Sequence, residues 1–442
     1  MHTRLAELTA QIKKTPGWRR VGRVTHITSD LLHVSGFSDQ AQIGHQTHLV
    51  CADGTRARGE VIEVNQDVCV VMPYGAVPNI RLSSPVYLNE SPDVLFPSDA
   101  WIGRIIDPFG CPLDGFPLSE GSVGRPIKPN PPPASQRNGL GARLNTGFAV
   151  LNTFLPIVEG QRVGLFAGSG VGKSSLLAGL CQRVEADVIV LAMIGERGRE
   201  VRHFVENTLG RDGMKRTIVI AATSDQSAPV RRRCAWTAMT VAEHFRDKGQ
   251  RVLFLADSIT RFAEAHRDIA LATGEVPALR GFPPSTAQLI MSLCERAGPG
   301  QQDQGSITAM FSVLVAGSDF DEPIADIVRG VLDGHIVLDR KIAERGRYPA
   351  IDLPKSVSRS LPHAATESEN AQLQDGRSLL SLYEQSETMI KAGLYAEGSD
   401  PKLDRAVRAW PELDGFIAKQ GDDSIQASFD RLTLILRRAG PA

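Results

Sequence analysis

The chain has 442 residues, of which 42% are apolar and 22% charged, and its net charge is −1. This composition is typical of a globular protein of two or three domains. The balanced charge argues against a broad non-specific nucleic-acid surface, although a local basic channel is compatible with it.

The six cysteines are far apart and form no C-x-x-C pair. We therefore expect reduced thiols in a cytosolic protein rather than a metal cluster. The sequence shows no secretory signal and no apolar run near the ~20 residues of a membrane-spanning helix. We expect membrane contact to be peripheral only.

Residues 1–17 are predicted to form an amphipathic N-terminal helix. Leu5, Leu8 and Ile12 share one helical face, and Pro16-Gly17 ends the segment. Two interpretations stay open, a short helix packed on its own domain and a docking helix for a partner or a membrane surface.

Residues 18–90 are predicted to form a small β-barrel domain. Short segments rich in Val, Ile and Thr are separated by Gly, Asp and Asn turns. The expected strands are 20–27, 31–34, 47–50, 59–64, 68–72 and 80–88.

Residues 91–362 are predicted to form an α/β core. It begins with a turn-rich stretch at 103–115 and a proline-rich connector at 125–133, which we expect to be an ordered strap. The expected strands are 163–167, 188–193, 217–221, 252–256, 307–315 and 335–338. Helical stretches such as 230–245 separate them, which is typical of a mostly parallel doubly wound sheet that binds ligands at the carboxyl ends of its strands.

Residues 363–442 are predicted to form a C-terminal helical domain. Segments 367–392 and 424–438 have amphipathic helical patterns. We expect breaks at Gly393, at 398–401 and at Pro411.

The sharpest motif is a glycine-rich loop between the first core strand and a helix. Such a loop turns its backbone N–H groups toward a polyphosphate, and the helix N-terminus adds positive potential. Lys173 can reach the β- and γ-phosphates, and the Ser174 hydroxyl can ligate Mg²⁺. The first glycine of the motif is replaced by Ala167, which costs little if that residue keeps a negative φ. The predicted nucleotide-binding residues of the loop are Gly168, Ser169, Gly170, Val171, Gly172, Lys173, Ser174 and Ser175.

Two further carboxylates follow apolar strands of the same predicted sheet. Asp257 ends the segment Val252–Ala256 and matches a Walker B acid that orients Mg²⁺. Glu196 follows Val188–Met193 and is our candidate for polarising the attacking water. Glu200 is a weaker candidate, since a salt-bridged rim carboxylate is the leading interpretation of this residue.

Two residues near the end of the core have more than one interpretation. Arg359 suits contact with phosphate oxygens of a neighbouring subunit, because arginine is always charged and forked, but it also fits a surface ion pair. Tyr348 could stack on a base or serve in packing or at an interface.

Together these segments resemble the rotary-type ATPase family, which includes the catalytic subunits of ATP synthases and the ATPases of type III protein export. The resemblance covers nearly the whole chain, and it is carried by GRIIDPFGCPLDG, GSGVGKSS, IGERGREV, VLFLADSITRFAEAHRD, SLCERAG, VAGSDFDEPIADIVRGVLDGHIVLDR and YPAIDLPKSVSRS. IGERGREV and Ala167 resemble the export branch. GLYAEGSDPKLD is similar to flagellar export ATPases, with the injectisome ATPases of virulence secretion as the alternative.

The resemblance implies specific roles and an assembly. Glu196 would be the catalytic carboxylate with Arg197 supporting it, Tyr348 the adenine-stacking aromatic, and Arg359 an arginine finger acting on the adjacent protomer. The implied enzyme is a Mg²⁺-dependent ATPase that forms a homohexameric ring at the cytoplasmic face of the membrane. The implied partners are a dimeric regulator, a coiled-coil stalk protein, export-gate membrane proteins and chaperone–substrate complexes.

Other functions compete with this interpretation. A hexameric RNA helicase would need exposed aromatic residues on a basic N-terminal domain, and residues 18–88 offer only Trp18, Phe37, Tyr74 and Tyr87. A non-catalytic nucleotide-binding subunit would lack the water-orienting carboxylate, whereas Glu196 is present. We expect hydrolysis rather than ATP synthesis, because the chain contains no membrane rotor.

Overall fold

The computed structural model describes residues 20–89, 93–315, 322–421 and 424–440. The expected N-terminal helix and Trp18 lie outside these ranges. The described chain divides into two compact units, one formed mainly by the residues up to 93 and the other by most of the remainder. The domain boundaries expected from the sequence stay predictions.

The first unit contains a closed antiparallel barrel with the strand order β1-β2-β5-β4-β3-β6. Apolar side chains from the strands and their connections fill the interior, among them Phe37, which is fully buried. The sixth strand is shorter than expected because Ser83, with a φ of 65°, turns the chain just before it. The barrel strands are β1 (Val21–Ile27), β2 (Leu32–Ser35), β3 (Gln46–Val50), β4 (Arg56–Val64), β5 (Val68–Pro73) and β6 (Pro85–Leu88).

The second unit is built on a nine-stranded sheet, in which eight strands have the order β17-β16-β10-β15-β13-β11-β12-β8 and the ninth, β14, pairs with β15. The central strands pair in parallel, as the sequence predicts. A separate two-stranded sheet joins β7 (Val94–Leu95) to β9 (Arg125–Pro126). The sheet strands are β8 (Ile105–Ile106), β10 (Arg162–Ala167), β11 (Val188–Glu196), β12 (Thr217–Thr223), β13 (Arg251–Asp257), β14 (Gly298–Pro299), β15 (Ser306–Leu314), β16 (Gly334–Leu338) and β17 (Val357–Ser358).

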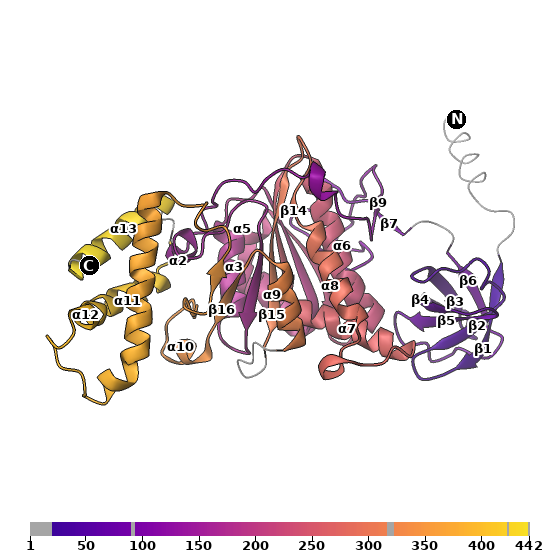
Figure 1. The fold of residues 1–442 in the computed structure, drawn as a ribbon. Helices are drawn as coiled ribbons and strands as arrows, with labels where there is room; N and C mark the ends of the chain where they lie inside the picture. Colours follow the sequence, from indigo (N-terminus) through magenta and orange to yellow (C-terminus); the bar gives the residue numbers. More distant parts are fainter. Residues whose placement is uncertain (1–19, 90–92, 316–321, 422–423, 441–442) are drawn as a thin grey trace. The chain divides into compact units, whose positions relative to one another are not determined.

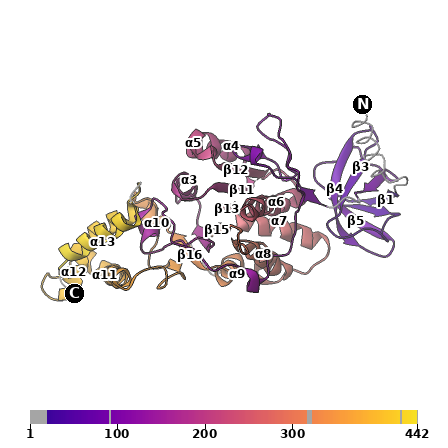
Figure 2. The ribbon, with the colours of Figure 1, turned by 90° about the horizontal axis from the view of Figure 1, so that it is seen from above.

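Helices cover both faces of this sheet (Figures 1 and 2). Figure 2 shows α6, α7 and α8 along one face and α3 on the other. The helices of the core are α2 (Ala149–Asn152), α3 (Lys173–Arg183), α4 (Gly198–His203), α5 (Gly210–Met214), α6 (Ala228–Asp247), α7 (Ile259–Ala272), α8 (Ser285–Arg296), α9 (Pro323–Val331) and α10 (Arg340–Glu344), with the π-helical turn η3 (Phe204–Leu209) and the short turns η1 (Asp99–Trp101), η2 (Ala134–Gln136) and η4 (Leu279–Gly281). Within the described residues, no helix is long and apolar enough to cross a membrane.

The proline-rich connector is ordered, as expected. Ile127 is buried, and its carbonyl oxygen accepts a hydrogen bond from Arg296 Nη1 at 2.9 Å. Thr240 Oγ1 donates to the same carbonyl at 3.2 Å. Lys128 lies over the ring of Trp236, with its Nζ 3.9 Å from the ring centroid. The segment is therefore held against α6 and α8.

The C-terminal helices α11 (Glu367–Lys391), α12 (Pro401–Ala418) and α13 (Ile425–Arg438) contribute to the same apolar core as α3. The sequence prediction of a break at Pro411 is wrong, because α12 continues through this proline. An interior proline typically costs about 3 kcal/mol, and burial of residues such as Leu413 and Phe416 on the inner face of α12 offsets this cost.

Candidate functional site

The phosphate loop joins the end of β10 to the start of α3. Gly170 and Gly172 have φ angles of 76° and 89°, and Gly172 caps the helix that begins at Lys173. A Cβ at Gly172 would also lie 3.0 Å from Tyr348 Cδ1, so glycine is required there twice over. Ala167 is buried in the extended strand and is not among the residues with a positive φ. The substitution of this first glycine is therefore tolerated without backbone strain.

Lys173 and Asp257 face each other across the carboxyl edge of the sheet. Lys173 Nζ donates a hydrogen bond to Asp257 Oδ1, and Ser312 Oγ donates to the same oxygen at 2.8 Å. The Lys173 and Asp257 side chains are only 12% and 7% exposed. Asp257 ends β13 and Ser312 lies in the adjacent β15. The lysine that would hold phosphate is thus paired with the Walker B carboxylate.

Glu196 ends β11 beside this pair. The register of β11 against β12 shifts between Ile194 and Glu196, and Gly195 has a φ of 68°. A bulge of this kind redirects a side chain, here at the edge that carries the phosphate loop. Burial raises the pKa of Glu196 to about 7, and the negative charges of Asp257 and Glu200 add to the increase, whereas Lys173 opposes it. Glu196 therefore exchanges its proton near neutral pH, as suits a group that handles water.

Arg197 and Glu200 lie at the rim of the site. Arg197 Nη1 is 3.5 Å from Glu200 Oε1, and the two side chains are 64% and 47% exposed. Glu200 is therefore a salt-bridged carboxylate at the rim, which is one of the two interpretations that the sequence allows. Arg197 pairs with Glu200 here, so a direct supporting contact with Glu196 stays a prediction.

The phosphate loop and these side chains line one cavity of about 1570 Å³. Its lining includes Glu196, Arg197, Glu200, Asp257 and the whole loop 168–175. The structure therefore brings together all the predicted loop residues and the candidate carboxylates. Tyr348 and Arg359, both described residues, are not part of this lining.

Tyr348 lies next to the phosphate loop. Its ring atoms approach the Cα side of Gly172, where an added Cβ would meet Cδ1 and Cε1 at 3.0 and 3.1 Å. The residue is 45% exposed. An exposed ring beside the last glycine of the loop is compatible with base stacking and also with a packing role.

Arg359 lies at the other end of the sheet. Its backbone N–H donates to Asp333 O at 3.0 Å, and its exposed guanidinium contacts the carbonyl oxygen of Arg329 through Nη2 at 3.4 Å. Arg162, which is hydrogen-bonded to Asp333, is the first residue of β10. The phosphate loop follows Ala167, the last residue of the same strand. Six residues of strand span about 20 Å. Arg359 is therefore too far from the phosphate loop of its own chain to contact the same nucleotide.

Sequence reasoning missed several residues of the site. Ser312 shares the Asp257 oxygen, and its only sequence signal is a polar position near the carboxyl end of an apolar strand. Arg261 lines the cavity and donates to Glu264 Oε2 at 2.8 Å. The hydrogen bond to Glu264 raises the pKa of Arg261 above its ordinary value, burial opposes this, and the charges of Glu264, Glu196 and Glu200 add to the increase.

Comparisons with known proteins identify the family. Residues 147–358 match the profile of the ATP synthase alpha/beta family, nucleotide-binding domain, and residues 365–433 match the T3SS EscN ATPase C-terminal domain. The chain is 41% identical to the flagellum-specific ATP synthase of Caulobacter vibrioides, covering 98% of this chain and 99% of that protein. It is 40% identical to the SPI-2 type 3 secretion system ATPase of Salmonella typhimurium, covering 92% of both. The chain belongs to the ATP synthase alpha/beta family.

A likeness to solved structures agrees with this membership. The assembled ATPase EscN of enteropathogenic E. coli matches with a TM-score of 0.86 at 34% identity, covering 94% of this chain and all of that chain. The same ATPase in complex with its central stalk EscO matches with a TM-score of 0.84, again at 34% identity and 94% coverage. The barrel, nucleotide-binding core and C-terminal helices are therefore those of a type III secretion ATPase within the ATP synthase alpha/beta family.

Proposed function

We propose that this chain hydrolyses MgATP in a homohexameric ring that energises flagellar protein export. The observation that carries the proposal is the placement of the phosphate loop and Arg359 at opposite ends of β10. A complete site then needs the loop of one subunit and the arginine of the next. Head-to-tail interfaces of this kind form a ring when the rotation between neighbouring subunits closes.

The side chains of one subunit supply most of the chemistry. Lys173 leaves Asp257 to bind the β- and γ-phosphates, and Glu196 orients the water for in-line attack on the γ-phosphate. Arg359 of the neighbouring subunit stabilises the charge of the transferring phosphoryl group, a contribution worth roughly 10³–10⁵ in rate for an arginine finger. Arg197 at the rim and Tyr348 beside Gly172 support the site and the base respectively.

The residues present fit a magnesium ion. Ser174 offers a hydroxyl in the first turn of α3, and Asp257 offers carboxylate oxygens, the hard ligands that Mg²⁺ prefers. Asp257 Oδ1 already holds the cationic Nζ of Lys173, so the same carboxylate can bind a cation once Lys173 turns to phosphate. Bound there, Mg²⁺ would neutralise charge on the β- and γ-phosphate oxygens.

The flagellar assignment is favoured over its alternatives by specific observations. The flagellar relative named above is 41% identical over 98% of this chain, whereas the injectisome ATPase is 40% identical over 92%. The flagellar relative is therefore similar over a larger share of the chain. A helicase role is disfavoured because Phe37 is in the barrel core rather than on a binding face. A non-catalytic role is disfavoured because Glu196 is present beside Lys173 and Asp257.

The proposed assembly works at the cytoplasmic face of the membrane with only peripheral membrane contact. Its proposed partners are a coiled-coil stalk in the ring centre, a dimeric regulator, export-gate membrane proteins and chaperone–substrate complexes. The stalk is supported by the relative solved with its central stalk EscO. We propose no nucleic-acid partner.

Mixed rings test the shared site. We expect Glu196→Gln and Arg359→Ala subunits each to be inactive alone. Random mixing in equal amounts leaves about a quarter of the head-to-tail interfaces with both intact groups, so about a quarter of wild-type turnover should return. No recovery in rings of normal size would refute the trans arginine. ATPase activity should also rise steeply with protein concentration as rings form.

A further inference from the structure

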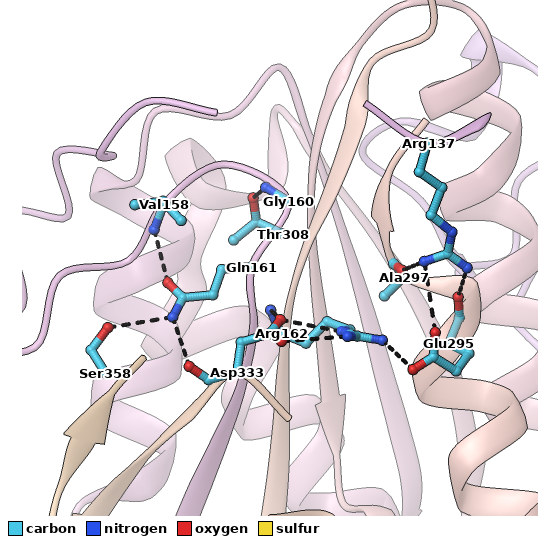
Figure 3. A network of polar contacts seen from close by, with 10 residues as sticks. All are labelled: Arg137, Val158, Gly160, Gln161, Arg162, Glu295, Ala297, Thr308, Asp333 and Ser358. Carbon is cyan, nitrogen blue, oxygen red and sulfur yellow. Dashed lines mark hydrogen bonds and ion pairs between the residues drawn. The ribbon is translucent and has the colours of Figure 1, made fainter. Parts of the chain in front are cut away.

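A partly buried polar network, with the buried Gln161 at its centre, lies at the end of the sheet opposite the phosphate loop (Figure 3). Arg162, the first residue of β10, donates to Asp333 Oδ2 from its backbone N at 3.0 Å and from Nε at 3.2 Å. The backbone N–H of Asp333 donates in return to Arg162 O at 2.8 Å. The start of β10 is therefore fixed to the residue just before β16.

Gln161 is the centre of this network. Its side chain is fully buried, and Figure 3 shows it pointing between Val158, Asp333 and Ser358. Gln161 Oε1 accepts from Val158 N at 2.9 Å, while Nε2 donates to Asp333 O at 3.1 Å and to Ser358 Oγ at 3.3 Å. A buried amide with its oxygen and both of its hydrogens paired holds its neighbours in one arrangement, because any movement leaves a buried polar group unsatisfied.

The carbonyl oxygen of Asp333 connects Gln161 to Arg359. It accepts from Gln161 Nε2 and also from the backbone N–H of Arg359 at 3.0 Å. Ser358, the residue before Arg359, contacts Gln161 and donates from Oγ to Pro156 O at 2.7 Å. The backbone of residues 358 and 359 is thus fixed from the start of β10, whereas the Arg359 side chain is exposed.

The same strand has a role at each end. β10 begins at Arg162 beside this network and ends at Ala167, where the phosphate loop starts. Arg162 also reaches α8, since its Nη1 donates to Glu295 Oε1 at 2.6 Å. Arg137 reinforces that contact by donating to the carbonyl oxygens of Glu295 and Ala297.

We propose that Gln161, with the Arg162–Asp333 pair, is a positioning group for Arg359 and so couples the phosphate loop of each subunit to the arginine that it donates to its neighbour. The inference depends on the proposed function, because it assumes that Arg359 acts in trans. Gln161 acts only through the backbone of residues 358–359. Displacement of β10 at one end is transmitted by a rigid strand to the base of Arg359 at the other.

Gln161→Met tests this role, because it keeps the volume but removes both N–H donors. We expect kcat to fall by at least tenfold, with the KM for ATP within about twofold, since an arginine finger contributes roughly 10³–10⁵ to rate and little to ground-state binding. Thr308→Val is the matched control. Thr308 is also buried at this end of the sheet and its Oγ1 accepts from Gly160 N at 2.9 Å, but that hydrogen bond does not lead to Arg359. Its kcat should stay within about twofold of wild type.

Mixed rings separate positioning of Arg359 from general damage. Gln161→Met subunits should regain activity when mixed with Glu196→Gln subunits, which supply an intact arginine. They should regain none with Arg359→Ala subunits, because both variants are defective in the same donated group. Recovery with Arg359→Ala but not with Glu196→Gln would overturn the inference, as would an unchanged kcat.

Two controls keep the outcomes distinct. Mixing Glu196→Gln with Arg359→Ala subunits tests the proposed function itself, and no recovery of activity in that mixture refutes the trans arginine. If that mixture recovers activity but Gln161→Met recovers with Arg359→Ala instead of with Glu196→Gln, only the inference about Gln161 is refuted. If Gln161→Met does not fold, Ser358→Ala replaces it in the same mixtures. This variant loses the contacts with Gln161 and Pro156 and should fall in the same group as Arg359→Ala.

Discussion

Replacement of Glu196 by glutamine should stabilise the nucleotide-free protein in a pH-dependent way. Burial, together with the charge of Asp257, raises the pKa of Glu196 from its ordinary 4.5 to about 7. When the pKa of a carboxyl is higher in the folded state than in the unfolded state, its contribution to stability is fully present at pH values below the unfolded-state pKa. That contribution is lost as the pH rises through the folded-state pKa. At pH 8 the native protein therefore carries an unfavourable charge that glutamine does not have.

The size of this effect follows from the two pKa values. Each pH unit between them corresponds to about 1.36 kcal/mol, so the interval from 4.5 to about 7 corresponds to about 3 kcal/mol. Glu196 is only partly buried, and solvent screening reduces the gain to about 1–2 kcal/mol. For a core of this size, that is a rise in Tm of about 2–6 °C.

Thermal unfolding of Glu196→Gln and wild type, without nucleotide, measures the difference at pH 5 and pH 8. We expect most of the gain at pH 8 and little at pH 5. Glu412→Gln is the control, because Glu412 is an exposed carboxylate of α12 paired with Arg438 at 3.2 Å, and its change should stay within about 0.5 kcal/mol at both pH values. An equal gain at both pH values, or a loss at pH 8, would refute the reasoning.

Three other predictions concern the site and the core. The value of kcat/KM for MgATP should fall about tenfold per pH unit below about 7, because protonated Glu196 cannot accept a hydrogen bond from water at that oxygen; a flat pH–rate profile down to pH 5.5 would contradict this role. Gly172→Ala should weaken ATP binding at least tenfold, as measured by titration calorimetry. A left-handed alanine costs about 1–2 kcal/mol, and its Cβ would meet the Tyr348 ring. Unchanged affinity would contradict this prediction. Glu243→Ala should lower the free energy of unfolding by about 3–5 kcal/mol because it leaves Arg296, 4% exposed, without its carboxylate, and a loss under 1 kcal/mol in urea unfolding would argue against this.

The sequence predicts the chemistry of the cavity well because its groups follow buried strands. Asp257 directly follows an apolar segment, Glu196 ends β11 after Gly195, and Lys173 follows β10 through the phosphate loop. The carboxyl ends of parallel strands meet at one edge of a sheet. Their convergence is therefore a consequence of topology. The bulge that redirects Glu196 was not predicted, because a glycine at 195 is compatible with several backbone conformations.

The C-terminal helices show where local signals are insufficient. Pro401, which the sequence predicts to lie in a break, is the first residue of α12, where its missing N–H is harmless. Pro411 gives a similar signal but lies inside α12, where tertiary packing decides. The adjacent Trp410 stacks on Tyr383 of α11 with ring centroids 4.5 Å apart. Such a contact between helices has no counterpart in a pattern read along the chain.

The two ends of β10 differ in what a sequence can reveal about them. The phosphate loop is contiguous with its strand and helix, so each part supports the interpretation of the next. The hydrogen bonds of Gln161 to Asp333 and Ser358 join residues 172 and 197 positions apart. No local pattern distinguishes that buried glutamine from a surface one, and only the parallel register of β10 and β16 brings it to the base of Arg359. A search for motifs thus finds the half of the site that binds nucleotide, while the half donated to the neighbour depends on long-range pairing.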